Sequence, residues 1–129
     1  PFPGIHALLE ALKNHGHKLL IATSKPETLA FEITKKFELF DYFDMVCGAT
    51  LDRSRVNKDD VIAYLLEKQE TRQDMVMVGD TAFDVIGAAA HGIPTIGVSW
   101  GYGSTQEMLD AGAVAIADST EELLALLEK

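Results

Sequence analysis

Residues 75–84 of this chain read MVMVGDTAFD, and this stretch decides the fold. Four apolar residues in a row, followed by Gly79 and Asp80, are typical of a strand that is buried on both faces in a parallel sheet. Asp80 then stands at the carboxyl end of that strand, and Asp84 follows four residues later near the start of a helix. We therefore predict a strand, a short acidic loop and a helix.

Short apolar runs and longer amphipathic patterns alternate on both sides of this stretch. We expect strands at 18–22, 45–47, 75–78, 95–98 and 114–117. We expect helices at 4–14, from Pro26 onward, at 58–69, 84–91 and 105–111, and from Thr120. This alternation predicts an α/β fold, a three-layer α/β/α sandwich around a mostly parallel sheet. Ligands of such sheets bind at the carboxyl ends of the strands.

The composition narrows the class of protein. The chain has 129 residues, of which 47% are hydrophobic, and a formal net charge of −9 from 11 Lys+Arg and 20 Asp+Glu. This size and apolar content predict one globular domain with a hydrophobic core. The acidic charge argues against nucleic acid or an anionic membrane surface as a partner, and it favours a divalent cation. A single cysteine, Cys47, excludes an internal disulfide, and we expect a cytoplasmic protein.

Asp80 and Asp84 have a spacing at which both carboxylates can face one pocket. Two like charges about 5 Å apart repel each other by a few kcal/mol at a partly buried site, so they need a counter-charge. Mg²⁺ is a hard cation that prefers oxygen ligands and keeps several waters. We therefore consider both carboxylates as ligands of Mg²⁺. In the alternative interpretation, Asp80 caps the following helix and Asp84 interacts with the positive end of that helix.

Hydroxyl and ammonium groups stand near two other predicted strand ends. In LLIATSK, residues 19–25, Thr23 and Ser24 leave a strand and lead into a helix, where hydroxyls and backbone N–H groups suit a phosphate. Lys58 follows the polar run at 52–57 and could neutralise a phosphate or hold a carboxylate. The alternatives are ordinary helix caps for Thr23 and Ser24 and a solvated surface lysine for Lys58.

Taken in this order, these motifs resemble those of the haloacid dehalogenase-like (HAD) hydrolase superfamily, most closely its phosphoglycolate phosphatase-like branch. The resemblance extends across essentially the whole chain and implies a Rossmann-like HAD core. It implies that Thr23, the backbone N–H of Ser24 and Lys58 bind phosphate. It also implies that Asp80, in the GDxxxD element, ligates Mg²⁺ directly and that Asp84 supports the ion through water. Thr23, Lys58 and Asp80 would then be catalytic residues of a Mg²⁺-dependent phosphatase acting on a small phosphorylated metabolite such as phosphoglycolate.

One element of the family is missing from residues 1–129. Members begin with a strand that carries an Asp-x-Asp pair, whose first Asp attacks phosphorus, and this sequence contains no such pair. The resemblance places that strand in the middle of the sheet, between the strands that end at Thr23 and Gly79, and it adds a helical cap domain. We therefore expect residues 1–129 to be an incomplete HAD core domain that is inactive alone. The nucleophile, which would form an aspartyl-phosphate, would lie in the rest of a longer protein.

Other activities fit the same sequence. A phosphomutase or a dehalogenase of the same superfamily is an alternative, because the missing strand and cap select the substrate and much of the reaction. A non-catalytic module that keeps an anion site is the alternative from a different class. The sequence makes no prediction of the oligomeric state.

Overall fold

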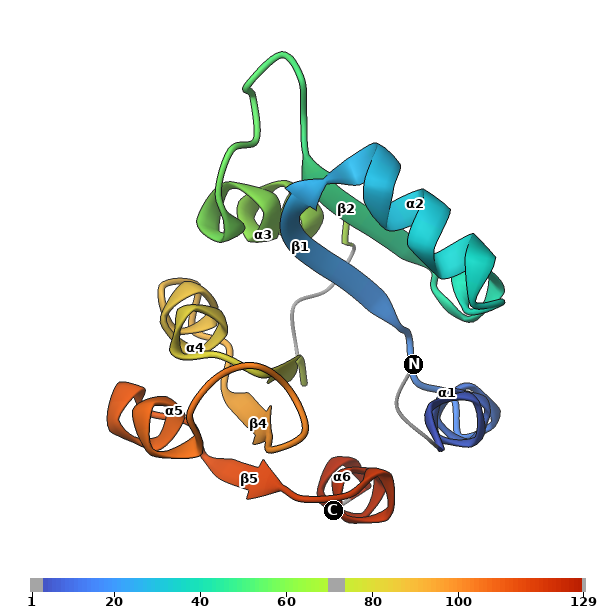
Figure 1. Ribbon diagram of the computed structural model, residues 1–129, viewed down its shortest axis with the longest axis vertical. Coiled ribbons are helices and arrows are strands. Elements are labelled where there is room, and N and C mark those ends of the chain that lie inside the picture. The colour runs from blue at the N-terminus through green and yellow to red at the C-terminus, as the bar shows by residue number, and fades with distance from the viewer. Residues whose placement is uncertain (1–3, 70–73, 129) are drawn as a thin grey trace. The chain divides into compact units, whose positions relative to one another are not determined.

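The computed structural model describes residues 4–69 and 74–128 of the chain (Figure 1). The chain divides into two compact units, Pro1–Gln69 and Glu70–Lys129. Each unit has its own sheet and its own helices, and we describe each by itself.

The first unit contains a two-stranded parallel sheet. Its elements in chain order are α1 (Ile5–Asn14), β1 (Leu20–Pro26), α2 (Glu27–Lys36), the 3₁₀ helix η1 (Phe40–Tyr42), β2 (Met45–Ala49) and α3 (Lys58–Glu67). Strands β1 and β2 pair from Leu20 with Met45 to Ala22 with Cys47. Helices α2 and α3 pack on opposite sides of this pair (Figure 1). Cys47 and Val61 are fully buried in the core between the sheet and α3.

The second unit contains a three-stranded parallel sheet in the order β3-β4-β5. Its elements are β3 (Met77–Gly79), α4 (Ala82–Ala89), β4 (Thr95–Val98), α5 (Thr105–Ala111), β5 (Ala115–Ala117) and α6 (Thr120–Leu127). Helices α4 and α5 lie on one side of the sheet and α6 on the other (Figure 1). The core is built around β4, in which every residue is buried, together with the fully buried Met108 and Ala117.

The predicted α/β class with parallel strands is confirmed in both units. Local signals account for several helix starts. The side chains of Asn57, Ser104 and Ser119 each accept a hydrogen bond from the backbone N–H three residues later, at 3.0, 3.2 and 3.1 Å. Such caps satisfy N–H groups that have no partner inside the helix. The predicted bounds of β4 and α5 agree with the structure at both ends.

The prediction that β1 ends at residue 22 is wrong. The strand continues to Pro26 and includes Thr23, Ser24 and Lys25, which the sequence interpretation placed in a turn. Pro26 is not the first helical residue but the N-cap, with φ −53° and ψ 136°. Its ring fixes φ at a value that suits both helix and extended chain, so ψ decides, and pairing of Pro26 with Ala49 keeps the backbone extended.

The prediction that the third strand is buried on both faces is also wrong. The strand begins at Met77, and Val76 and Val78 are 43% and 41% exposed. Among the described elements, β3 pairs with β4 alone, and α4 is the helix that packs on it. The side chains that point away from α4 are therefore left open. β1 likewise pairs only with β2 among the described strands.

No described helix has both the length and the apolar character that crossing a membrane requires.

Candidate functional site

The carboxyl end of β1 carries a bulge. Ala22 pairs with Cys47 and the next pair is Pro26 with Ala49, so β1 advances by four residues while β2 advances by two. The extra residues are in the segment Thr23–Lys25, which we call the β1 bulge. Bulges of this kind redirect side chains and are common next to active sites. The bulge places hydroxyl and backbone N–H groups directly before the first turn of α2.

Within the β1 bulge, the Thr23 hydroxyl fixes the backbone locally. Thr23 Oγ1 accepts a hydrogen bond from the N–H of Lys25 at 3.2 Å. Thr23 is half-buried, whereas Ser24 and Lys25 are exposed. The Thr23 hydroxyl thus constrains the backbone of the bulge, whereas Ser24 faces solvent. This arrangement suits an anion that approaches the amino end of α2.

Lys58 lies beside the β1 bulge. It is the first residue of α3, and its Nζ donates a hydrogen bond of 2.9 Å to the carbonyl oxygen of Ala22. Ala22 immediately precedes Thr23, so the half-buried ammonium group is held at the carboxyl end of β1. The structure therefore brings together Lys58 and the segment that contains Thr23 and Ser24. Lys58 is not a fully solvated lysine.

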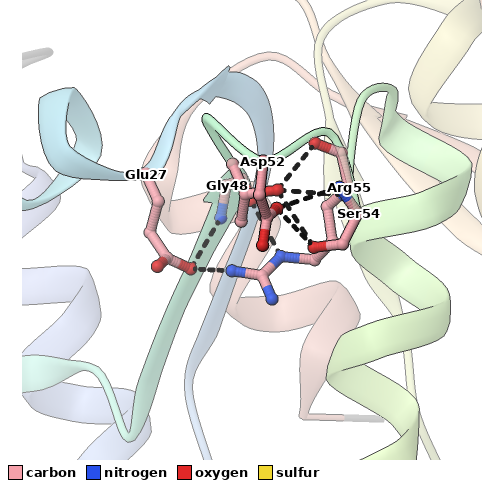
Figure 2. A network of polar contacts seen from close by, with 6 residues as sticks. Glu27, Gly48, Asp52, Ser54 and Arg55 are labelled. Carbon is pink, nitrogen blue, oxygen red and sulfur yellow. Dashed lines mark hydrogen bonds and ion pairs between the residues drawn. The ribbon is translucent and has the colours of Figure 1, made fainter.

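A second cation, which the sequence interpretation treated only as part of a polar run, binds near the same strand ends (Figure 2). The Arg55 side chain is buried; its Nε donates to the Gly48 carbonyl oxygen at 3.0 Å and its Nη2 to Glu27 Oε1 at 2.8 Å. The same Glu27 oxygen accepts from the Gly48 N–H at 3.3 Å. The guanidinium carbon lies 3.8 Å from the centroid of the Tyr64 ring. A polar loop with an arginine three residues before Lys58 was the one available signal in the sequence.

The loop between β2 and α3 is closed by its own hydrogen bonds. The N–H of Thr50 donates to the Arg55 carbonyl oxygen at 2.9 Å, and the N–H of Arg55 donates to Thr50 Oγ1 at 3.1 Å. Asp52 Oδ1 accepts from the N–H and the hydroxyl of Ser54 at 3.0 and 2.8 Å (Figure 2). The backbone hydrogen bond from Ser54, with side-chain hydrogen bonds from Thr50 and Ser54, lowers the pKa of Asp52 to about 2. These hydrogen bonds order the loop that contains Arg55 and leads to Lys58.

In the second unit, Asp84 holds the backbone around Asp80. Asp84 is buried, and its Oδ2 accepts from the N–H of Asp80 at 3.0 Å and from the N–H of Thr81 at 3.2 Å. A Cβ on Gly79 would lie 2.4 Å from the Asp84 Cβ, so only glycine fits there. Thr81, rather than Asp80, is the N-cap of α4. The alternative in which Asp80 caps the helix is therefore wrong, whereas Asp84 does interact with the helix start.

Asp80 is also held by the loop after β4. Its Oδ2 accepts from the N–H of Tyr102 at 3.1 Å, and its carbonyl oxygen accepts from the N–H of Gly103 at 3.0 Å. A Cβ on Gly101 would lie 2.1 Å from the Asp80 Cβ, and one on Gly103 would lie 2.2 Å from the Asp80 carbonyl oxygen. Gly101 and Gly103 therefore let the backbone of this loop pack directly against Asp80.

The Asp80 carboxylate is a suitable ligand for a magnesium ion. Magnesium is usually bound by one or two protein carboxylates, with waters and substrate phosphates as the other ligands. Asp80 Oδ1 takes no part in the hydrogen bonds described above, and a carboxylate oxygen is a hard ligand. In the described part of the chain, no group of three or more His, Cys, Asp or Glu side chains could hold a metal ion. A site here would therefore depend on water and substrate oxygens as well as on Asp80.

Comparison with known proteins adds three findings. The family model for haloacid dehalogenase-like hydrolases matches residues 1–98. The chain is 35% identical to a phosphoglycolate phosphatase of Cupriavidus necator over 98% of its own length and 55% of that protein. It is 46% identical to the tyrosine-protein kinase PtkA of Mycobacterium tuberculosis over 79% of its length and 35% of that protein.

A solved structure shows the same fold. The crystal structure of a predicted phosphatase from Clostridium acetobutylicum matches with a TM-score of 0.93 and 42% sequence identity, over 99% of this chain and 60% of that one. The chain thus spans between about a third and three fifths of the length of these three proteins.

Proposed function

Because this chain belongs to the haloacid dehalogenase-like hydrolase family, with a relative among the phosphoglycolate phosphatases, we propose that the protein is a Mg²⁺-dependent phosphatase. Its substrate is a small phosphorylated metabolite such as phosphoglycolate. The observation that carries the proposal is the hydrogen bond from Lys58 to Ala22, which holds a cation beside the β1 bulge.

In this proposal, the first unit binds the phosphoryl group. The Thr23 hydroxyl, the backbone N–H of Ser24 and the Lys58 ammonium group donate to the phosphoryl oxygens. Such donors stabilise the negative charge of the transition state, and each is typically worth about 2.7 to 4 kcal/mol in the barrier. The fixed position of Lys58 supports this role, because a donor that is already in place needs no reorganisation during the reaction.

The acidic ligands of the proposal are Asp80 and Asp84. Asp80 would bind Mg²⁺ through a carboxylate oxygen, and Asp84 would support the ion through water while its Oδ2 holds the backbone of Asp80. The ion, held by these residues, would supply positive charge that neutralises the phosphoryl oxygens. The hydrogen bond from the Tyr102 N–H orients the Asp80 carboxylate, so its direction does not depend on the ion.

The nucleophile of the proposed reaction lies outside residues 1–129, which contain no Asp-x-Asp pair. An aspartate carboxylate attacks phosphorus, the bond to the substrate oxygen breaks, and a second aspartate gives a proton to the leaving alcohol. Water then hydrolyses the aspartyl-phosphate and releases inorganic phosphate. The incomplete HAD core of residues 1–129 would be inactive alone. Strands β1 and β3, each with one edge unpaired among the described strands, support a further strand in the whole protein.

The test is phosphatase activity of the full-length protein and of its Lys58→Ala variant. We expect hydrolysis of p-nitrophenyl phosphate and phosphoglycolate that needs Mg²⁺ and stops with EDTA. Loss of the Lys58 donor should reduce kcat/KM at least a hundredfold, as removal of one such donor typically does. Lys18→Ala is the matched control, because Lys18 is an exposed lysine of the same unit. A Lys58→Ala variant that retains the parent rate would contradict the assignment.

A second candidate is phosphoryl transfer to a protein tyrosine, which the 46% identity to PtkA favours. Incubation of the full-length protein with γ-labelled ATP and a tyrosine-containing peptide distinguishes the two. Labelled peptide without release of phosphate from p-nitrophenyl phosphate would favour the kinase. Activity on a phosphosugar isomer or a haloacid would favour the mutase or the dehalogenase. No turnover of any of these, with retained phosphate binding, would favour a non-catalytic anion-binding module.

A further inference from the structure

We propose that Arg55 is a positioning residue that fixes the β1 bulge for phosphate binding. Arg55 lies in the loop before α3 and Lys58 is the first residue of α3, and their side chains bind the two ends of this segment. Lys58 binds the carbonyl oxygen of Ala22, just before the bulge, and Arg55 binds the carboxylate of Glu27, just after it. The proposal rests on the function proposed above, since the bulge would supply Thr23 and Ser24 to the substrate.

The β1 bulge needs such a support. Its residues lie outside the ladder of β1 and β2, and Ser24 and Lys25 are exposed. The hydrogen bond between Thr23 and Lys25 is internal to the bulge and does not attach it to the rest of the unit. Segments with few buried contacts open at low free energy. Contacts at both ends therefore decide how well the donors of the bulge are placed.

Glu27 connects Arg55 to the bulge. Glu27 is the first residue of α2, two residues after Lys25, and its Oε1 accepts from both Arg55 Nη2 and the Gly48 N–H. Gly48 packs tightly against the same place, because a Cβ there would lie 2.7 Å from the Glu27 Cα and from the Lys25 carbonyl oxygen. Arg55 also binds the Gly48 carbonyl oxygen. One guanidinium group thus ties the end of β2 to the start of α2 (Figure 2).

Arg55 and Lys58 share a rigid support. Asn57 caps α3, and Asp60 Oδ2 accepts from the N–H of Val56 at 3.0 Å, so the backbone between the two cations is held on both sides. On the other side of Arg55, Thr50 closes the loop. A shift of Arg55 would therefore also move Lys58.

The chemistry of this site requires arginine. The guanidinium group donates to two acceptors at once and stacks on Tyr64, whereas a lysine would offer a point charge that cannot do both. The side chains of Arg55 and Glu27 are 10% and 26% exposed, against 34% for each partner of the Lys13–Asp44 ion pair. Removing one partner of a mostly buried pair leaves the other without compensation, and the segment that carries it moves.

The test compares Arg55→Gln with Arg53→Gln in the full-length protein. Arg53 is an exposed arginine of the same loop, so this control removes the same charge without touching Glu27. We expect Arg55→Gln to raise KM for p-nitrophenyl phosphate and Ki for inorganic phosphate about tenfold to a hundredfold, as misplacement by about 1 Å can do. The Mg²⁺ concentration for half-maximal activity should not change, because Asp80 is held by other contacts. Arg55→Lys should restore only part of the loss.

Hydrogen exchange gives a readout that does not depend on activity. Peptides that cover residues 23–27 should exchange faster in Arg55→Gln than in the parent or in Arg53→Gln, while peptides of α6 should not change. If Arg55→Gln does not fold, Glu27→Gln replaces it, since its amide keeps an acceptor but loses the charge. In the double variant that carries both Arg55→Gln and Glu27→Gln, the two effects on exchange should not add, because both substitutions remove the same ion pair.

Three results would overturn the proposal. Unchanged exchange at residues 23–27 in the folded variant would do so whether or not the protein is a phosphatase. Parent values of KM and Ki would do so as well. An equal loss in phosphate and Mg²⁺ affinity would show that Arg55 only stabilises the fold. A parent protein without phosphatase activity would instead refute the proposed function, and exchange would then decide the role of Arg55 alone.

Discussion

The two units hold their candidate site residues in different ways. In the first unit, charged side chains hold the polar groups: Lys58 binds a carbonyl oxygen, and Arg55 binds Glu27 and Gly48. In the second unit, backbone N–H groups and glycines hold the acidic groups, since Asp80 is bound by the Tyr102 N–H and packed against Gly101. Long side chains can adjust when a neighbour changes, whereas backbone packed at van der Waals contact cannot. We therefore expect graded effects of substitution in the first unit and abrupt effects in the second.

Asp80→Asn should have the largest effect. The amide retains an oxygen that can accept from the Tyr102 N–H, so the fold should be retained while the charge is lost. We expect kcat/KM of the full-length protein to fall at least a hundredfold, comparable to the loss of one charge-stabilising donor. Steady-state kinetics over a range of Mg²⁺ concentrations measures it. Asp110→Asn, an exposed substitution on α5, is the control, and parent activity in Asp80→Asn would remove this residue from the mechanism.

Gly101→Ala tests whether the second unit tolerates change in its backbone packing. The added Cβ would lie 2.1 Å from the Asp80 Cβ, so the loop or the aspartate must move. We expect activity to fall about tenfold to a hundredfold and the Mg²⁺ requirement to rise, because small displacements of a catalytic group cost this much. Tyr102→Ala is the matched control, since the Tyr102 side chain is fully exposed and only its N–H contacts Asp80. Equal activity of both variants would show that this loop does not position Asp80.

Asp52→Asn tests the hydrogen bonds of the loop that carries Arg55. Of the substitutions in this Discussion, we expect it to have the smallest effect, which is on the pH dependence of stability. The pKa of Asp52 is lowered from 3.8 to about 2 by hydrogen bonds from Ser54 and Thr50. The unfolded chain therefore binds the proton more readily than the folded protein. The stabilising contribution of Asp52 is fully present above about pH 4 and is lost as the pH falls towards 2.

Thermal unfolding between pH 2 and pH 6 measures this contribution. The parent should lose stability more steeply on acidification than Asp52→Asn does. Asp41→Asn, an exposed aspartate of the same unit, should behave as the parent does. Curves of identical slope for the parent and Asp52→Asn would show that the loop hydrogen bonds do not contribute to stability.

Much of the fold could be predicted from local sequence. Pro94, Ser104 and Gly112 are local signals for the start of β4 and both ends of α5, and these bounds agree with the structure. The length of β1 could not be predicted in this way. Residues 23–25 have the composition of a turn, and they are extended because Pro26 pairs with Ala49, which lies far away in the sequence.

The same distinction between local signals and long-range contacts applies to the candidate site residues. Thr23, Ser24, Lys58, Asp80 and Asp84 could be proposed from the sequence, because each stands near a predicted strand end or helix start and carries a group suited to phosphate or to a cation. Arg55 could not, since its acceptors lie 7 and 28 residues away in the chain. The hydrogen bond to the Asp80 carboxylate likewise comes from the N–H of Tyr102, which lies 22 residues later in the chain.

The sequence by itself determined the parallel α/β class, most helix starts and the residue types at the strand ends, because caps, turns and apolar periods act over a few neighbouring residues. Only the tertiary structure decided where β1 bulges, which cation is buried and which glycines contact Asp80. Those features depend on contacts between backbone and side-chain groups of different strands and loops. A local sequence pattern does not specify such long-range contacts.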